Sequence, residues 1–243
     1  NIMTAAKKNP FSQEAQKESA DLYTESLEAR SKAIGVLGAG LMGSGIVTVF
    51  SEKNVRTVMI DKESAGLQRG LKAVSAYFDE KFKKRRLKWF ERDTKKNHVT
   101  ASTEFSSLKS CPVIIEAVFE DLKIKHDVLK KCEKSINQEN FIFATNTSSI
   151  PISQIAAGAK HPENVVGMHF FSPVPKMPLV EIITHSKTKD SVTSAVFDLA
   201  TTMGKQIIVV KDGPGFYTTR ILAFQIAEAL NVLFEGAKID DID

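Results

Sequence analysis

Among the side chains that could exchange protons near neutral pH, one histidine stands out by its context. His169 ends the apolar stretch VVGMHFF and is followed by the proline-rich turn SPVPKMP. An imidazole titrates near neutral pH, so it can take the proton of a hydroxyl group while the attached carbon is oxidised. His169 is therefore the candidate general base. The other histidines, which we expect to be solvated, are His98, His126, His161 and His185.

Glu181 is the candidate partner of this histidine. It lies inside the otherwise apolar stretch LVEIIT. A buried unpaired charge costs several kcal/mol, so this carboxylate needs a partner. Pairing with His169 would satisfy the carboxylate and raise the basicity of the imidazole. The alternative is a glutamate held by a lysine or by a backbone N–H group.

Two further polar clusters follow apolar runs. The stretch ATNTSSIP at 144–151 offers hydroxyl groups and an amide to a substrate oxygen. Its alternative role is structural, because Ser148 or Ser149 could cap the helix expected next. The stretch EAVFED at 116–121 carries Glu116 and Glu120 near another strand end and precedes two lysines, Lys123 and Lys125.

The stretch GVLGAGLMGSG at 35–45 contains the spacing G-x-G-x-x-G at Gly38, Gly40 and Gly43. In a dinucleotide site, the first glycine allows a tight turn, the second lets the backbone approach the diphosphate, and the third permits close packing of helix on strand. Asp61 ends the next apolar run, where its carboxylate can bind ribose hydroxyls and repel a 2′-phosphate. These features favour NAD over NADP. A glycine-rich turn beside a surface aspartate is the alternative.

Short apolar runs alternate with segments of helical period after residue 31, and this pattern predicts an α/β fold with a mainly parallel sheet covered by helices on both faces. The expected strands are 32–37, 56–60, 112–118, 141–145, 165–170, 180–184 and 206–210. The expected helices are 41–53, 63–88, 121–136, 151–158, 189–203 with Gly204 as its C-cap, and 216–235.

The pattern divides the chain into three parts. Residues 1–30 are polar and are interpreted as a linker, with room for one loosely docked helix. We expect residues 31–211 to form a Rossmann-like NAD-binding domain. Residues 212–243 have helical apolar spacing with no strand to follow, so we interpret them as the truncated start of an all-α C-terminal domain. The chain begins with Asn rather than Met, which we interpret as the start of an excised piece.

Composition excludes several classes of function. The 33 basic and 29 acidic residues give a net charge of +4, too small to indicate nucleic-acid binding. The dense basic run KFKKRRLK at 81–88 is either a solvated helix face or a clamp for a phosphorylated ligand. The two cysteines, Cys111 and Cys132, do not have the number or spacing of a zinc site and are expected in the core of a protein from a reducing compartment. No metal site and no membrane-spanning run is expected, which indicates a soluble protein.

Several stretches, in order, resemble the 3-hydroxyacyl-CoA dehydrogenases of fatty-acid β-oxidation. More closely, the stretches resemble the dehydrogenase regions of multifunctional α-subunits of the mitochondrial trifunctional type. The similarity covers about 31–243, and the linker at 1–30 would follow an enoyl-CoA hydratase domain. The matching stretches are GLMGSG at 40–45, EAVFEDLKIK at 116–125, ATNTSSIPIS at 144–153, GMHFFSPVPKMPLVEII at 167–183 and KDGPGFYTTR at 211–220.

The resemblance implies oxidation of an (S)-3-hydroxyacyl-CoA to the 3-oxoacyl-CoA with reduction of NAD⁺. It implies that His169 is the general base, Glu181 its orienting partner, and Ser148 a hydrogen-bond donor to the reacting oxygen. Ser148, Ser172, Thr219 and Lys81 would contact the substrate, Lys81 through the CoA moiety. The cofactor-binding positions would be Gly38, Gly40, Leu41, Met42, Gly43, Asp61, Glu120 and Lys125.

At two positions this chain departs from the single-function short-chain enzymes: it has Ser172 and Thr219 where they carry asparagine. The multifunctional α-subunits resemble this chain at both positions. The resemblance also implies a mitochondrial location, a thiolase-type partner subunit and homo-oligomers of the full-length protein. Two alternatives stay open. One is another NAD-dependent β-hydroxyacid oxidoreductase, whose lysine-bearing motif is absent here, and the other is a non-catalytic, crystallin-like relative.

Overall fold

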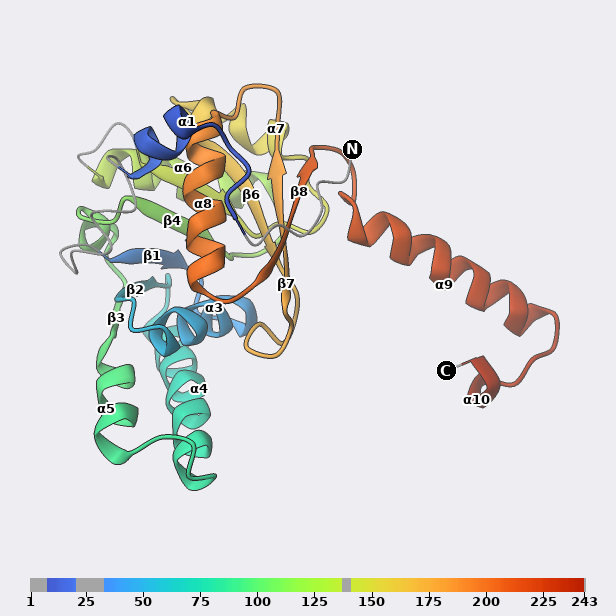
Figure 1. Cartoon of the computed structure of the whole chain (residues 1–243), viewed down its shortest axis with the longest axis horizontal. Helices are drawn as coiled ribbons and strands as arrows, with labels where there is room; N and C mark the ends of the chain where they lie inside the picture. The colour runs from blue at the N-terminus through green and yellow to red at the C-terminus, as the bar shows by residue number, and fades with distance from the viewer. Residues whose placement is uncertain (1–7, 21–32, 137–140, 243) are drawn as a thin grey trace.

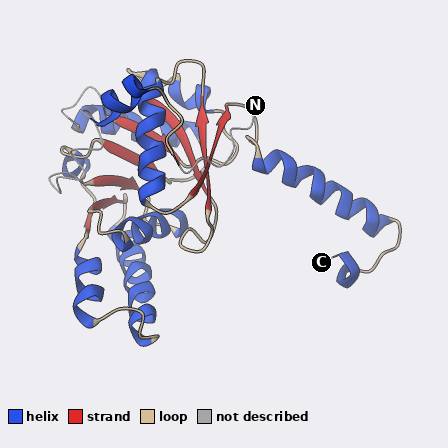
Figure 2. Cartoon of the chain, viewed as in Figure 1, coloured by secondary structure: helices blue, strands red, loops and turns tan. Residues whose placement is uncertain are grey.

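The computed structural model describes residues 8–20, 33–136 and 141–242, and one sheet lies at its centre (Figure 1). The sheet has eight strands in the order β3-β2-β1-β4-β5-β6-β7-β8. The strands, drawn red in Figure 2, are β1 (Ile34–Leu37), β2 (Thr57–Ile60), β3 (Val99–Ser102), β4 (Val113–Glu116), β5 (Ile142–Thr145), β6 (Val165–Phe170), β7 (Leu179–Thr184) and β8 (Gln206–Lys211).

Six strands, from β3 to β6 in the sheet order, are paired in parallel. Their carboxyl ends therefore lie along one edge, where α/β folds bind ligands. β7 runs antiparallel to β6, and β8 runs parallel to β7. The expectation of a mainly parallel sheet is confirmed, and the hairpin of β6 and β7 is the exception to it.

Helices cover both faces of the sheet, as expected from strands that are apolar on both sides. One core cluster contains Phe50, Phe78 and Phe197, contributed by α3, α4 and α8. The other contains Leu129 of α6 and Ile155 of α7. The described helices are α1 (Gln13–Ser19), α3 (Leu41–Glu52), α4 (Ser64–Lys83), α5 (Trp89–Asn97), α6 (Leu122–Ser135), α7 (Ile152–Ala156), α8 (Asp190–Thr202), α9 (Thr218–Phe234) and α10 (Ile239–Ile242).

Two expectations about the elements are wrong in the same region. The single helix expected at 63–88 ends at Lys83, where Arg85 has a left-handed φ of 56°, and a second helix, α5, follows. No glycine or proline marks this turn, so the helical pattern gave no stop signal. The edge strand β3 was not predicted, because its residues VTAS are half-exposed and lack an apolar run.

The two ends of the described chain contact the sheet domain differently. Helix α1 packs on α8: Phe11 meets the ring of Phe197 edge-on at 6.5 Å, and Asn9 Nδ2 donates to Ser194 Oγ at 2.8 Å. The rest of the predicted linker, at 1–7 and 21–30, lies outside the described residues. Helix α9 extends away from the sheet and has no buried residue (Figure 1). The domain boundary expected near 211 stays a prediction.

Both cysteines lie in the core, as predicted. Cys111 and Cys132 are fully buried and free. Burial raises the pKa of the Cys111 thiol to about 12, and it also raises the pKa of Cys132. Of the helices in the described ranges, none combines the length and the apolar character needed to cross a bilayer.

Candidate active site

The glycine-rich turn joins β1 to α3, and each glycine of the motif has its own structural reason. Gly38 has a φ of +95°, and a Cβ there would lie 2.5 Å from the Ala117 carbonyl oxygen. A Cβ on Gly43 would lie 1.8 Å from the carbonyl oxygen of Gly38, so only glycine lets α3 approach the turn. A Cβ on Gly40 would meet nothing within 4 Å, because this backbone faces open space. The turn is thus closely packed on one side and open on the other.

The open side of this turn fits an anion. Helix α3 begins after Gly40 with no side-chain cap and no acidic residue in its first turn, so its first N–H groups have no side-chain acceptor. Leu41 is 74% exposed and Met42 half-buried over this end of the helix. Asp61, at the end of β2, accepts the Ala39 N–H at 2.9 Å, which places its carboxylate beside the turn. The diphosphate and adenosine ribose of NAD match these groups in charge and in hydrogen bonding.

An ion cluster, here called the lysine cluster, consists of the buried Glu116 and Lys125 and the partly exposed Glu120. Lys125 Nζ contacts Glu116 Oε1 at 2.8 Å and Oε2 at 3.0 Å, and Glu120 Oε2 at 3.2 Å. Lys125 and Glu116 are fully buried. Glu116 also accepts hydrogen bonds from the Thr145 hydroxyl and the Val118 N–H. The cluster ties the ends of β4 and β5 to the first turn of α6.

Glu120 holds the loop that carries Ser148. Its Oε1 accepts the Thr147 hydroxyl and the N–H groups of Ser148 at 3.0 Å and Ser149 at 3.2 Å. Burial would raise the pKa of Glu120, but the Thr147 hydrogen bond, the charge of Lys125 and the Ser148 N–H lower it to about 2. Ser148 is therefore presented at the carboxyl edge by a carboxylate that stays ionised.

Neither serine caps α7, so that alternative was wrong. Asp212 does so instead: its carboxylate accepts the N–H of Ile152 at 2.8 Å and of Ser153 at 2.9 Å. A carboxylate at a helix N-terminus satisfies unpaired N–H groups and complements the helix dipole. The sequence pattern could not indicate this cap, because Asp212 lies about sixty residues further along the chain.

His169 and Glu181 form the pair expected from the sequence. They lie directly opposite each other in the antiparallel ladder of β6 and β7. His169 Nδ1 lies 2.7 Å from Glu181 Oε2, and the two side chains are 8% and 0% exposed. An ionised carboxylate only accepts hydrogen bonds, so Nδ1 carries the proton and Nε2 of the neutral ring keeps a lone pair.

Two aromatic rings flank this imidazole. The ring centroid of Phe171 lies 4.5 Å from that of His169, and the centroid of Phe216 lies 6.1 Å away. Both rings limit solvent around a base that is already buried. His185 is also buried, contrary to our expectation, because its Nε2 hydrogen-bonds the Pro162 carbonyl oxygen at 3.0 Å. That contact is structural and lies away from the His169–Glu181 pair.

The second oxygen of Glu181 has a partner that sequence reasoning missed. Oε1 accepts the backbone N–H and the hydroxyl of Thr218, both at 2.8 Å. The backbone N–H named as an alternative holder of Glu181 is thus present together with the histidine. Burial raises the pKa of Glu181, but the hydrogen bonds from His169 and Thr218 outweigh it and lower the pKa below its ordinary value.

The remaining candidate substrate residues lie at separate places. Ser172 is exposed at the start of the turn after β6, and Thr219 is half-buried in the first turn of α9. Lys81, on α4, forms an ion pair with Glu52 and lies over the Tyr77 ring at 4.9 Å. Burial lowers the pKa of Lys81, but the contacts with Glu52 and Tyr77 raise it overall. Lys81 is thus already engaged within the protein.

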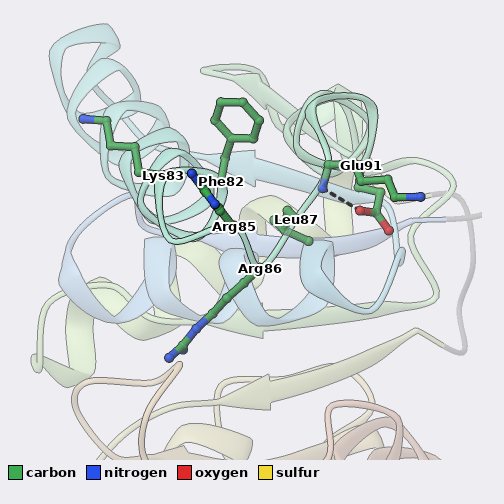
Figure 3. A pocket seen from close by; sticks show the side chains of 7 residues that line it. Phe82, Lys83, Arg85, Arg86, Leu87 and Glu91 are labelled. Atoms are coloured by element: carbon green, nitrogen blue, oxygen red, sulfur yellow. Dashed lines mark hydrogen bonds between the residues drawn. The ribbon is translucent and has the colours of Figure 1, made fainter.

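A basic hollow of about 620 Å³ lies at the connection of α4 and α5, on residues distinct from those at the strand ends. Figure 3 shows Arg86 pointing away from the other side chains that line it, while Glu91 accepts the backbone N–H of Lys88. No ion pair within the described ranges neutralises its four cations. The lining residues are Phe82, Lys83, Arg85, Arg86, Leu87, Lys88 and Glu91.

Comparison with known proteins yields consistent matches. The model of the family described as "3-hydroxyacyl-CoA dehydrogenase, NAD binding domain" matches residues 33–213. The fatty acid oxidation complex subunit alpha of Shewanella frigidimarina is 43% identical over 213 residues, which are 87% of this chain and 30% of that protein. The chain therefore spans under a third of the length of this curated relative.

Solved structures agree with these matches. The (S)-3-hydroxybutyryl-CoA dehydrogenase PaaH1 from Ralstonia eutropha superposes with a TM-score of 0.84 at 38% identity, over 87% of this chain and 75% of that one. The dehydrogenase part of multifunctional enzyme 1 from C. elegans has the same fold, with a TM-score of 0.68 at 22% identity, over 96% of this chain and 55% of that one.

Proposed function

Because this chain belongs to the 3-hydroxyacyl-CoA dehydrogenase family and contains its NAD-binding domain, we propose that the whole protein oxidises an (S)-3-hydroxyacyl-CoA to the 3-oxoacyl-CoA. The observation that carries this proposal is the buried His169–Glu181 pair, whose free ring nitrogen is a base near the ligand-binding edge of the sheet. NAD is the cofactor of the family domain.

Each part of the reaction has a candidate residue. Bound NAD⁺ supplies a hydride acceptor. His169 Nε2 takes the proton of the 3-hydroxyl group as the hydride leaves the same carbon, and the C–O bond becomes a carbonyl. Glu181 keeps Nδ1 protonated and stabilises the imidazolium that forms. The Ser148 hydroxyl, held in place through the loop bonds to Glu120, donates to the reacting oxygen.

The cofactor would be held by the groups whose fit is described above. The N–H groups at the start of α3 would bind the diphosphate, and the Asp61 carboxylate would bind the adenosine ribose. Because Asp61 would repel a 2′-phosphate, we expect NAD to bind at least tenfold more tightly than NADP, an ordinary charge effect of about 1.4 kcal/mol. Fluorescence titration with each dinucleotide measures this ratio.

An assay of NADH formation tests the activity. We expect turnover with 3-hydroxybutyryl-CoA, and reverse oxidation of NADH with acetoacetyl-CoA. Free 3-hydroxybutyrate and acetoacetate should give little or no turnover. Activity on the free acids with none on the CoA esters would instead support the alternative of a β-hydroxyacid oxidoreductase. Binding of NAD without turnover of any of these substrates would support the crystallin-like alternative.

The basic hollow supports a proposal for the CoA moiety, the ligand that Lys81 was predicted to contact. Lys81 is paired with Glu52, so the unpaired cations beside it are the better candidates for the phosphates of CoA. Replacing Arg85 and Arg86 by alanine should raise KM for a CoA ester and leave KM for the matching pantetheine ester unchanged. Equal KM changes for both esters would refute a phosphate site there.

Two broader features rest on the family resemblance alone. The first is a mitochondrial location, although the curated relative reported above is bacterial. The second is assembly of the whole protein with a thiolase-type partner and as a homo-oligomer. Subcellular fractionation tests the first. Co-purification of the endogenous protein, followed by a thiolase assay and mass measurement of the complex, tests the second.

A further inference from the structure

The carboxylate of Glu181 is held from two sides by different parts of the chain. Oε2 faces His169 Nδ1 at 2.7 Å, on the neighbouring strand. Oε1 accepts two hydrogen bonds at 2.8 Å from Thr218, one from its N–H and one from its hydroxyl. His169 is the only titratable side chain in contact with this fully buried carboxylate among the described residues. Thr218 therefore supplies the two hydrogen bonds on the side of the Glu181 carboxylate that faces away from His169.

The chain reaches this position through a strained junction. Gly215 and Phe216 have positive φ values of 70° and 47°. A phenylalanine in this region is unusual, and it persists where the surrounding structure requires it. Phe216 is 3% exposed, and its ring lies 6.1 Å from the His169 ring. The junction between β8 and α9 thus sets Phe216 beside the His169 ring and leads directly into Thr218, which bonds Glu181.

Packing of α9 does not account for the position of Thr218. Thr218 is the first residue of this helix, and no residue of the helix is buried. Its polar contacts with the described chain are directed at Glu181. A purely structural reading is that the carboxylate caps the N-terminus of α9. The N–H of Thr218 alone would make such a cap, so the bond from the Thr218 hydroxyl to Glu181 is additional to it.

We propose that Thr218 is a positioning residue for the general base. It directs Glu181 Oε2 toward His169 Nδ1, and its hydroxyl disperses part of the carboxylate charge and so limits the basicity of the imidazole. This inference rests on the proposed function of His169. It also makes the first turn of α9 a structural component of a site otherwise built on the sheet.

Substitution of the hydroxyl alone tests this role in the complete protein. Thr218→Val removes the hydroxyl and keeps the N–H and the β-branched shape, whereas Thr218→Ser keeps the hydroxyl. Thr218→Ala is a second hydroxyl-free variant in case the valine variant does not fold. Thr202→Val is the matched control, because it removes a hydroxyl that bonds a helix carbonyl on the exposed side of α8.

Two measurements are made on each variant: the pH profiles of kcat and kcat/KM, and the NMR titration of the His169 ring, assigned by its loss in His169→Gln. We expect Thr218→Val to lower kcat roughly tenfold, the effect of losing one hydrogen bond to a charged group. The more negative carboxylate should move the acid limb and the ring titration upward by about 0.5 pH unit. Thr218→Ser and Thr202→Val should match the parent protein.

Unchanged midpoints in both hydroxyl-free variants would overturn the proposal. So would a serine variant as impaired as the valine variant, since a packing role would produce that result. If the parent protein shows no dehydrogenase activity, the proposed function fails. The ring titration would still decide whether Thr218 tunes the His169–Glu181 pair.

Discussion

Glu116 and Glu181 are both fully buried carboxylates on strands of one sheet, but their partners differ. Glu116 faces a lysine, and its other contacts are the Thr145 hydroxyl and a backbone N–H. Glu181 faces a histidine whose second ring nitrogen has no partner among the described residues. The contacts of Glu116 thus lie within the protein, whereas the His169–Glu181 pair leaves a base that can act on a ligand.

Burial of a charged side chain is thus by itself a poor indicator of catalysis. The residue type that pairs with the buried charge is a better indicator. Lys125 contacts both oxygens of Glu116 and also Glu120, so the lysine cluster stabilises a fixed geometry. Histidine changes charge near neutral pH, so the His169–Glu181 pair can accept a proton. The predictions below test these two roles separately, through activity for the His169–Glu181 pair and through stability for the lysine cluster.

Loss of the base should have the largest effect. His169→Gln is expected to lower kcat by about 10²- to 10⁴-fold, the usual contribution of general acid–base catalysis. Binding of NAD, measured by titration, should be nearly unchanged, because His169 is not among the residues expected to hold the cofactor. Parental turnover in this variant would refute the role of His169.

Loss of the lysine should instead reduce stability. Lys125→Met leaves the buried Glu116 charge unpaired, which should cost about 3–5 kcal/mol of unfolding free energy. Urea unfolding without cofactor measures this cost free of any contribution from ligand binding. The double variant with Glu116→Gln should recover part of the loss. A double variant less stable than Lys125→Met would show that the lysine cluster is not held together by charge.

Neutralising Glu181 should affect activity more than folding. Glu181→Gln removes a charge-assisted hydrogen bond to the imidazolium, so kcat should fall by about 10- to 100-fold. The acid limb of kcat/KM should move to lower pH, opposite to Thr218→Val, because the protonated ring loses its counter-charge. A shift to higher pH would contradict this account of the His169–Glu181 pair.

The smallest effect concerns Glu120. Its pKa in the folded protein, about 2, lies below the ordinary 4.5, so the carboxylate stabilises the fold above pH 4.5, and this contribution is lost as the pH falls toward 2. Its side chain is 35% exposed, so after screening by solvent we expect only about 1–2 kcal/mol. The stability difference between the parent and Glu120→Gln should narrow as urea unfolding is repeated at decreasing pH from about pH 5.5 toward pH 2.5. If the stability difference stays constant as the pH falls, the ionic origin of the Glu120 contribution is refuted.

The sequence predicted most of the fold, because much of it depends on local patterns. Apolar runs indicated seven of the eight strands, and the spacing of Gly38, Gly40 and Gly43 indicated the turn after the first one. Errors occurred where local signals were weak. The turn after Lys83 has no helix-breaking residue, and β3 has no apolar run.

Prediction of the candidate site was partial for a related reason. His169 and Glu181 were detectable as polar residues in apolar runs, and the need to pair a buried charge linked them. The partners of the other charged side chains were not detectable. Lys125 pairs with the buried Glu116 rather than facing solvent, and Asp212 rather than a nearby serine caps α7. These partners are far apart along the chain, so no local spacing indicates them.

By itself, the sequence determined which segments are strands and helices and which residue types could do chemistry, because backbone preferences and apolar periodicity act between near neighbours. The sequence pattern did not indicate that β7 runs antiparallel to β6, the register that brings the expected His169–Glu181 pair together. Only the tertiary structure decided this strand direction and the return of Thr218 to the same carboxylate. Such contacts depend on the packing of the whole sheet, since the energy that selects one register is spread over many distant residues.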